Sequence, residues 1–409
     1  MIGKKVNLLN YILIIVLFLY FFMSNLSNHN IYCDIMIIAF SFFSIILMLF
    51  KKKVYINKYF IFYLLFVLYQ VLLIVLGRAY NTSITIKVLT TLIINFSILI
   101  MIYNFIINNN NIERILKVYI YSSSLSLLTI MFILRNTLFT SRLAHAYGEG
   151  SISFYFLGKA TVLSSNSIAF YCAVSALICL YFLTKYKQKK YLFLALFLMF
   201  GSILTGSRKG ILLLIIYLLY FVHYHFKGNY LKRILIVMGV CLTIYLVLTK
   251  VPAFYNILGY RLMELVNKIL GNTSHEGSIV AREAYKRFAL EMIPRNLFLG
   301  YGAGYFSYVY GNVTEINYLE ILVAGGIVGL FIYYFNYILI LKNYLLSRKH
   351  VSNITKVLFV VFISLFINDI GAVTYTARNI LTALVLFLGS MKIDDERYKN
   401  EIKKKQKNN

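Results

Sequence analysis

The sequence of 409 residues contains no tryptophan, only two prolines and four cysteines, and 14 acidic residues against 41 lysines and arginines. The cysteines, Cys33, Cys172, Cys179 and Cys241, lie in or beside apolar runs. We interpret them as packing residues and expect neither a disulfide framework nor a zinc site. Charged residues make up 13% of the chain and hydrophobic residues 60%, which excludes a soluble protein. Without tryptophan, the 36 tyrosines must supply the aromatic belts of a membrane interface.

Apolar runs of about 20 residues recur from end to end, and each can cross a hydrocarbon core of about 30 Å. The sequence therefore predicts an all-α polytopic integral membrane protein with about twelve transmembrane helices. The predicted spans are 8–23, 31–50, 59–77, 84–107, 115–134, 164–184, 191–205, 210–226, 231–249, 317–341, 354–369 and 374–391. Residues 1–391 are expected to form one helical bundle, and 392–409 a disordered, basic cytoplasmic tail. Lys4 and Lys5, before the first run, predict a retained span.

Lysine-rich loops alternate with lysine-poor ones along the chain. The positive-inside rule then places both termini in the cytoplasm and one large late loop, 250–316, outside. Because the lysines flank membrane spans, the net charge of +27 does not indicate a nucleic-acid partner. Most arginines, by contrast, fall on the outer side: Arg78, Arg135, Arg142, Arg208, Arg261, Arg282, Arg287, Arg295 and Arg378. Guanidinium groups there suit bidentate capture of phosphate, and ion pairing with external acids is the alternative.

The late loop is expected to contain an amphipathic helix. Its apolar stripe is Val280, Ala281, Ala284, Tyr285, Phe288, Ala289, Met292 and Ile293, and Pro294 ends it. Arg282 and Lys286 lie one turn apart on the polar side, so both can reach one diphosphate. The alternative is a surface helix that lies on the bilayer with its basic face solvated.

Two shorter stretches are further candidates. Thr205–Gly210 predicts a tight external turn whose amides, with the following helix N-terminus, form an anion seat beside Arg208. An ordinary basic hairpin is the alternative. Glu315 directly precedes a span, where a carboxylate that faces the bundle is a functional candidate. It can also simply sit in water at a helix N-terminus, where the helix dipole favours it.

Two other stretches give weaker indications of function. The run Gly300–Gly304 lacks a preceding strand and a βαβ unit, so it does not indicate a dinucleotide site. Asp369 and Arg378 flank the last external turn, and pairing with each other is the alternative to a role in binding.

Three stretches in order resemble the O-antigen ligase/polymerase superfamily, Wzy-type polymerases in particular. They are Thr205–Gly210, Ala281–Ala284 leading to Asn296–Gly304, and Asn317–Leu322 followed by Gly325–Leu330. The resemblance covers about residues 160–340. One position departs from the family pattern: Glu315 stands where a histidine is usual, three residues before Tyr318. A carboxylate can deprotonate or orient a hydroxyl but cannot act as a cation, which disfavours the ligase subclass more than the polymerase.

The resemblance implies a glycosyltransferase of the bacterial cytoplasmic (inner) membrane. Its implied substrate is an undecaprenyl-diphosphate-linked oligosaccharide, and its product O-antigen or capsular polysaccharide. The transfer would need no metal and no cofactor, and membrane lipids and a chain-length regulator protein are the expected partners. The predicted catalytic residues are Arg208, Arg282 and Glu315. The predicted substrate-binding residues are Ser207, Lys209, Lys286, Arg287, Asn317, Tyr318, Arg78 and Arg378.

Two other functions share some of these features. A ligase that transfers finished chains to another acceptor has the same motifs and differs in its product. A lipid-linked-oligosaccharide flippase belongs to a different class and needs charges deep inside its spans. Here the charges within spans lie near the predicted ends, for example Asp34, Lys87 and Glu320. This distribution favours an enzyme that faces outward.

Overall fold

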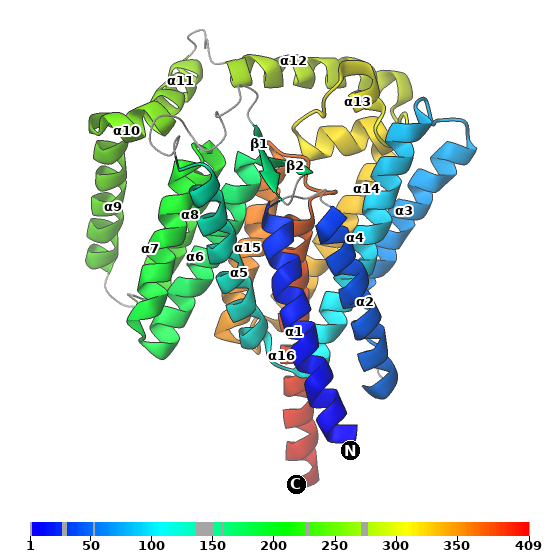
Figure 1. Ribbon diagram of the computed structural model, residues 1–409, viewed down its shortest axis with the longest axis vertical. Coiled ribbons are helices and arrows are strands. Elements are labelled where there is room, and N and C mark those ends of the chain that lie inside the picture. The colour runs from blue at the N-terminus through cyan, green and yellow to red at the C-terminus, as the bar shows by residue number, and fades with distance from the viewer. Residues whose placement is uncertain are drawn as a thin grey trace. The chain divides into compact units, whose positions relative to one another are not determined.

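The computed structural model describes residues 2–26, 31–51, 54–135, 151–156, 159–225, 230–270 and 277–408 (Figure 1). The chain divides into two compact units. Unit 1 comprises Met1–Leu13, Ile37–Ile112 and Gly277–Asn409, and unit 2 comprises Ile14–Met36 and Glu113–Glu276.

Every predicted span coincides with a helix. These helices are α1 (Ile2–Leu26), α2 (Ile31–Lys51), α3 (Lys58–Val75), α4 (Thr82–Asn109), α5 (Ile112–Ile133), α6 (Ser165–Tyr186), α7 (Lys189–Leu204), α8 (Arg208–His225), α9 (Tyr230–Lys250), α14 (Asn317–Ser347), α15 (Asn353–Asp369) and α16 (Arg378–Asn408). Among the described residues, six helices are long and apolar enough to cross a membrane: those within α1, α3, α4, α5, α6 and α14. A multi-pass membrane protein is therefore supported, and the count of twelve crossings stays a prediction.

A short hairpin interrupts the expected all-helical chain. Strands β1 (Ser151–Phe156) and β2 (Lys159–Ser164) pair antiparallel, with Ser151 opposite Ser164 and Phe156 opposite Lys159. The sequence predicted only an external loop there. The segment Ser151–Phe156 reads serine, isoleucine, serine, phenylalanine, tyrosine, phenylalanine. It is rich in the β-branched and aromatic residues that favour strands, a signal that the search for apolar spans overlooked.

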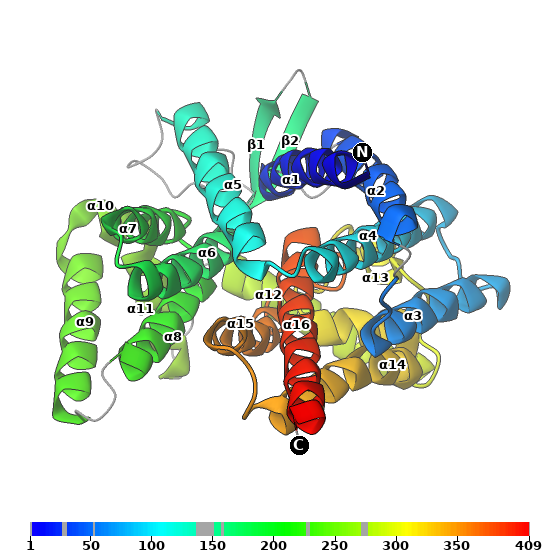
Figure 2. The same ribbon diagram turned by 90° about the horizontal axis from the view of Figure 1, so that it is seen from below.

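In unit 1, α4 packs against α16, α16 also packs against α15, and α14 packs against α3 (Figure 2). The close approach of α16 to α4 depends on Gly389, where an added Cβ would lie 2.7 Å from Ile106 Cγ2. The expected disordered tail is instead helical, since α16 continues to Asn408. The tail that begins at residue 392 is therefore a continuation of α16.

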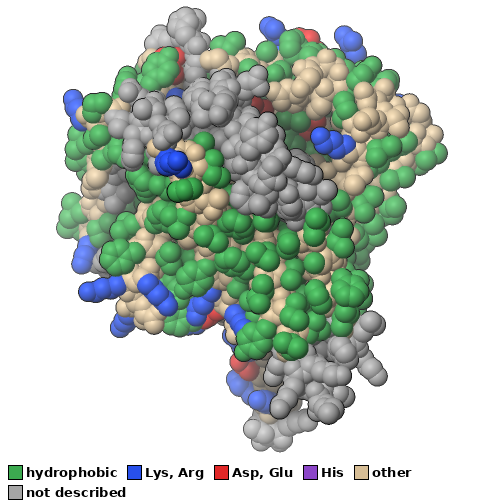
Figure 3. Space-filling model, in the orientation of Figure 1, with side chains coloured by type: hydrophobic (Ala, Val, Ile, Leu, Met, Phe, Trp, Pro, Cys, Tyr) green, Lys and Arg blue, Asp and Glu red, His purple; other side chains and the backbone are tan. Residues whose placement is uncertain are grey.

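In unit 2, α6 is the central helix and packs against α7 and α8. Small residues allow the approach of α8, because a Cβ on Gly210 would lie 2.6 Å from Ala169 Cβ. Cys172 and Cys179 on α6 are buried free thiols, which agrees with their prediction as packing residues. Figure 3 shows Lys and Arg side chains at the lower ends of the helices in this unit. The α6–α7 connection carries Lys185, Lys187, Lys189 and Lys190.

Before the late loop reaches unit 1, unit 2 ends in α10 (Pro252–Phe254), the π-helix η1 (Tyr255–Gly259) and α11 (Tyr260–Ile269). The rest of the loop forms α12 (Gly277–Met292), the 3-10 helix η2 (Ile293–Asn296) and α13 (Tyr305–Tyr310). Helix α12 thus lies where the amphipathic helix was predicted, and Pro294 lies in the tighter turn that follows it.

The apolar stripe of α12 packs mostly within the protein. Its buried members Ala289, Met292 and Ile293 form one core with α13 and the start of α14, and Tyr285 and Phe288 pack against that core. The core also contains Tyr301, Phe306, Ile316, Leu319 and Val323. Val280 and Ala281, at the start of the predicted stripe, are exposed instead. The second half of α12 is therefore held against α14, as Figure 1 shows.

Helix α14 is broken at Gly326, whose φ of 62° and ψ of −164° are not helical. The segment after η2 replaces the lost helical hydrogen bonds. Tyr301 N and Gly302 N donate to the carbonyls of Val323 and Ala324, both at 2.8 Å. On the other side of the break, Ile327 N donates to Leu297 O at 2.9 Å. Within a membrane each open backbone group would be costly, so the late loop and α14 must fold together.

Candidate functional site

Arg282 and Glu315 form an ion pair in unit 1. Arg282 lies in the second turn of α12, and Glu315 lies in the short connection between α13 and α14. Arg282 Nε donates to Glu315 Oε2. The two side chains are 30% and 34% exposed, so the pair lies at the surface of the late loop and solvent reaches it. The structure thus brings together two of the three predicted catalytic residues.

The connection that carries Glu315 is held by a buried carboxylate. Glu320, in the first turn of α14, is 2% exposed and its Oε2 accepts a hydrogen bond from Thr314 N at 2.9 Å. Thr314 Oγ1 donates to Ile316 O at 2.9 Å, which closes the turn around Glu315. Glu320 therefore positions Glu315. The sequence analysis noted Glu320 as a charge near the end of a span but assigned it no role in the site, although an acidic residue inside an apolar span is a signal for such a role.

Asn317 links the start of α14 to the turn between α15 and α16. Its side-chain oxygen accepts from Thr374 N at 2.9 Å and from Tyr375 N at 3.0 Å. Its Nδ2 donates to Tyr334 Oη at 3.0 Å, and Tyr334 donates in turn to Asp369 Oδ2 at 2.7 Å. Asn317 is fully buried. We therefore interpret Asn317 as a positioning residue, and a contact between its side chain and substrate stays a prediction.

Arg78 holds the late loop in place. Its Nη1 donates to Asn296 Oδ1 at 2.8 Å and to Gly300 O. Gly302, with φ of 94°, lies directly against the Arg78 carbonyl, so that no side chain fits between them. Tyr69 on α3 adds a second link, because its hydroxyl contacts both Leu299 O at 3.1 Å and Gly325 O at 2.9 Å. These contacts tie α3 to the break in α14.

The remaining cations of unit 1 differ in their surroundings. Lys286 is exposed on α12, one turn after Arg282. Arg287 is 70% exposed, lies 4.0 Å from Glu291 and rests on the Phe288 ring. Arg378 is 3% exposed and its Nε donates to Asn95 Oδ1 at 3.2 Å. Of these three, Lys286 is the one best placed to share a ligand with Arg282.

Tyrosines surround the late loop, and most are packed against each other. Tyr301 and Tyr305 stack with ring centroids 4.4 Å apart, and Tyr80 lies 4.6 Å from Tyr305. Burial raises the pKa of Tyr305 above its ordinary value. Tyr318, by contrast, is 37% exposed and lines an apolar groove of 560 Å³ along α14. The other lining residues are Ile327, Leu330, Phe331, Tyr334, Phe335, Ile338, Phe366 and Asp369.

In unit 2, the predicted anion seat is a capped helix start. Gly206 has a φ of 62°, and α8 begins at Arg208. Ser207 Oγ accepts from Gly210 N at 3.4 Å and donates to Asn166 Oδ1 at 2.7 Å, so Ser207 is the N-cap of α8. Arg261 Nη1 donates to Gly206 O at 2.6 Å. Arg208 and Lys209 are partly exposed on the first turn.

Residues 193–334 match a family model described as O-Antigen ligase. The matched stretch is about a third of the chain and contains the Arg208 turn, the Arg282–Glu315 pair and the Gly326 break. It confirms the resemblance to the O-antigen ligase/polymerase superfamily. A membrane-bound, glycosyltransferase-like enzyme of the O-antigen ligase/polymerase type is the class that this match supports. No curated protein sequence matches the chain.

Proposed function

We propose that the protein is a polymerase that joins undecaprenyl-diphosphate-linked repeat units into O-antigen or capsular polysaccharide at the outer face of the cytoplasmic membrane. The observation that carries the proposal is the surface pair of Arg282 and Glu315, held by the buried Glu320 at the start of α14. A cation and a carboxylate side by side supply the two charges that the transfer requires.

The reaction separates a diphosphate from a sugar. The bond between the donor's anomeric carbon and the diphosphate oxygen breaks, and a bond forms from that carbon to a hydroxyl oxygen of the incoming unit. The diphosphate leaves with additional negative charge, which the Arg282 guanidinium stabilises through two parallel hydrogen bonds. Lys286, exposed one turn along α12, adds a second positive charge. For Arg208, at the start of α8, a contact with phosphate stays a prediction.

Glu315 has two roles in this proposal. Its carboxylate orients Arg282 through the Nε hydrogen bond, so that the guanidinium keeps its two terminal nitrogens for the diphosphate. It also accepts the proton that the attacking hydroxyl loses, which balances the transfer. The surface position of the pair allows sugar chains on both sides of the reaction to reach it.

The apolar groove beside Tyr318 suits the polyprenyl chain of such a substrate. It begins at Tyr318, one residue after the start of α14, and follows the helix to Ile338. Residues 327, 330, 331, 334, 335 and 338 recur at helical spacing, so they form one face. A lipid tail in this groove would hold its diphosphate near the polar end of α14.

Purified protein in proteoliposomes with a lipid-linked repeat unit tests the proposal. Wild-type protein should produce a ladder of polymer, and Arg282→Lys should abolish it because the bidentate geometry is lost. Arg295→Lys is the matched control, since Arg295 is exposed in η2, directly after the same helix, and is not among the predicted catalytic or substrate-binding residues. Full-length polymer from Arg282→Lys would refute the arginine's role.

A ligase is the second candidate, because the matched family is described as O-Antigen ligase. The two activities differ in the acceptor. If the purified protein transfers preformed chains to a separate acceptor and does not extend lipid-linked units, the ligase assignment replaces the polymerase.

A further inference from the structure

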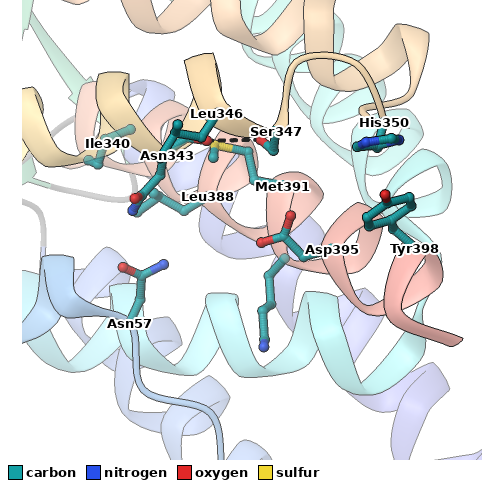
Figure 4. Close-up of a pocket in the computed structure, with 11 residues that line it drawn as sticks. Asn57, Ile340, Asn343, Leu346, Ser347, His350, Leu388, Met391, Asp395 and Tyr398 are labelled. Carbon is teal, nitrogen blue, oxygen red and sulfur yellow. Dashed lines mark hydrogen bonds between the residues drawn. The ribbon is translucent and has the colours of Figure 1, made fainter. Parts of the chain in front are cut away.

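A second cavity lies at the opposite end of α14 from the Arg282–Glu315 pair. Its volume is 430 Å³, and it lies where α14 ends and α3 begins, against α16. Its lining residues are Asn57, Ile340, Asn343, Leu346, Ser347, His350, Leu388, Met391, Lys392, Asp395 and Tyr398 (Figure 4). The 31 residues of α14 separate the two sites, so the cavity takes no part in the proposed transfer.

The lining changes from apolar to polar along the helices. Ile340, Leu388 and Met391 come from the apolar parts of α14 and α16, whereas His350 follows the end of α14 and Tyr398 lies in the charged last part of α16. The rings of His350 and Tyr398 stack with centroids 3.7 Å apart at one edge of the cavity. An amphipathic molecule at the membrane surface matches such a gradient.

Asp395 is the acidic group of this lining. Figure 4 shows its carboxylate directed into the space between the labelled side chains. Among the residues that the structure describes, Asp395 makes no hydrogen bond and no ion pair, whereas its neighbour Asp394 caps Ser352 at 2.8 Å. Burial raises the pKa of Asp395, and Lys392 and Lys399 oppose that rise. A cation beside the carboxylate would offset the cost of its burial.

Lys392 supplies a complementary charge on the same side of α16. It lies three residues before Asp395, a spacing that puts the two side chains about 5–6 Å apart at Cβ. Its Nζ is 3.5 Å from Glu396, so it pairs away from Asp395. Asn343 and Ser347 add oxygen acceptors on the facing side of the cavity. A primary ammonium has three N–H groups to donate to such oxygens.

We propose that this cavity binds the headgroup of an ethanolamine phospholipid. The ammonium donates to Asp395 and to the oxygens of Asn343 and Ser347, the phosphate lies beside Lys392, and the acyl chains follow Ile340 and Leu388. An anionic headgroup without an ammonium would meet the Asp395 carboxylate unfavourably. A choline headgroup has no N–H to donate.

Because the sequence contains no tryptophan, a single introduced tryptophan can report on lipid binding by its fluorescence. Leu346→Trp places one fluorophore in the cavity lining, and Leu345→Trp, on the adjacent exposed position outside the lining, is the matched control. Both variants are reconstituted in phosphatidylcholine vesicles. Equal fractions of brominated phosphatidylethanolamine, phosphatidylglycerol or phosphatidylcholine then quench the fluorophore on contact.

The expected result is stronger quenching of Leu346→Trp by the brominated ethanolamine lipid than by the other two, with no such preference for Leu345→Trp. Adding Asp395→Asn should abolish the preference, and Asn343→Leu, at an exposed position, should weaken it. Equal quenching by all three lipids, a preference for phosphatidylglycerol, or a preference that survives both substitutions would overturn the proposal. The readout needs no polymerase activity, so it stands apart from the proposed function.

Discussion

The Arg282 guanidinium donates to the carboxylate of Glu315, a non-glycine residue whose backbone is left-handed, with φ of 58°. Such a conformation costs about 1–3 kcal/mol and persists only where the surroundings enforce it. Here Thr314 and Glu320 enforce it through the hydrogen bond between Thr314 N and Glu320 Oε2 at 2.9 Å. The buried Glu320 therefore helps to fix the position of the Glu315 carboxylate.

The first prediction concerns the proton that the acceptor loses. Glu315→Gln keeps an oxygen for Arg282 Nε but removes the charge, so the protein should fold normally. Turnover should fall by about 10²–10⁴-fold, the usual contribution of a general base. Single-turnover rates with a lipid-linked repeat unit measure the change. Wild-type rates in this variant would remove the base role and leave Glu315 as an orienting residue.

Glu315→His provides a matched variant for the same role. An imidazole is a base in its neutral form, with an ordinary pKa of about 6.5. Activity in this variant should partly return and should rise with pH across that value, because protonated imidazole cannot accept the proton. A pH–rate profile identical in shape to that of the wild type would contradict proton transfer at this position.

The second prediction concerns the break in α14. Gly300 and Gly311 have nearly equal backbone angles, with φ of 71° and 70°. A Cβ at Gly300 would lie 2.5 Å from Gly326 N, whereas one at Gly311 meets open space. Alanine at either position carries the left-handed cost of about 1–2 kcal/mol. Gly300→Ala adds overpacking of about 1–3 kcal/mol and should separate the loop from α14.

Thermal unfolding of the two alanine variants in nanodiscs distinguishes these contributions. The midpoint of Gly300→Ala should fall well below that of Gly311→Ala. Equal midpoints would mean that the contact between the late loop and the break contributes little to stability.

The helices could be predicted from the sequence because each depends on a local apolar run. All twelve predicted spans coincide with helices, and the predicted amphipathic helix is α12. The break at Gly326, by contrast, could not be predicted from a local run of residues. Its compensating hydrogen bonds come from Leu297–Gly302, so the signal is shared between segments that are more than 20 residues apart. The sequence shows the glycines in both segments, but it does not predict that the two segments contact each other.

In the candidate site, too, single residues could be predicted from local patterns, but their contacts could not. Arg282 and Glu315 were predicted separately, from helical spacing and from a charge at a membrane edge. That they pair depends on how α12 packs against α14, through Ala289 and Met292, which residue spacing alone does not reveal. Asn317 was predicted as a substrate contact, yet its complete burial follows from the later turn at Thr374 and Tyr375. Local patterns identified candidate residues, and tertiary packing determined which of them lie together and which are buried.

The third prediction tests Asn317 as a positioning residue. Asn317→Ala leaves the amides of Thr374 and Tyr375 without their acceptor, at a cost of about 1–3 kcal/mol for each buried donor. The unfolding midpoint should drop clearly. Asn312→Ala, at an exposed position where the amide contacts Tyr285 Oη at 3.4 Å, should change it little. If Asn317→Ala abolishes activity at an unchanged midpoint, Asn317 contacts substrate and our structural interpretation is wrong.

The fourth prediction concerns the side of the membrane on which the late loop lies. Asn312 and Lys349 are exposed positions beyond the two ends of α14. In a variant without native cysteines, Asn312→Cys should react with a membrane-impermeant maleimide added outside spheroplasts. Lys349→Cys should react only after the membrane is permeabilised. Because a lipid-linked oligosaccharide at the outer face can meet Arg282 only if α12 lies outside, the opposite labelling pattern would refute the proposed polymerase even if the family assignment stands.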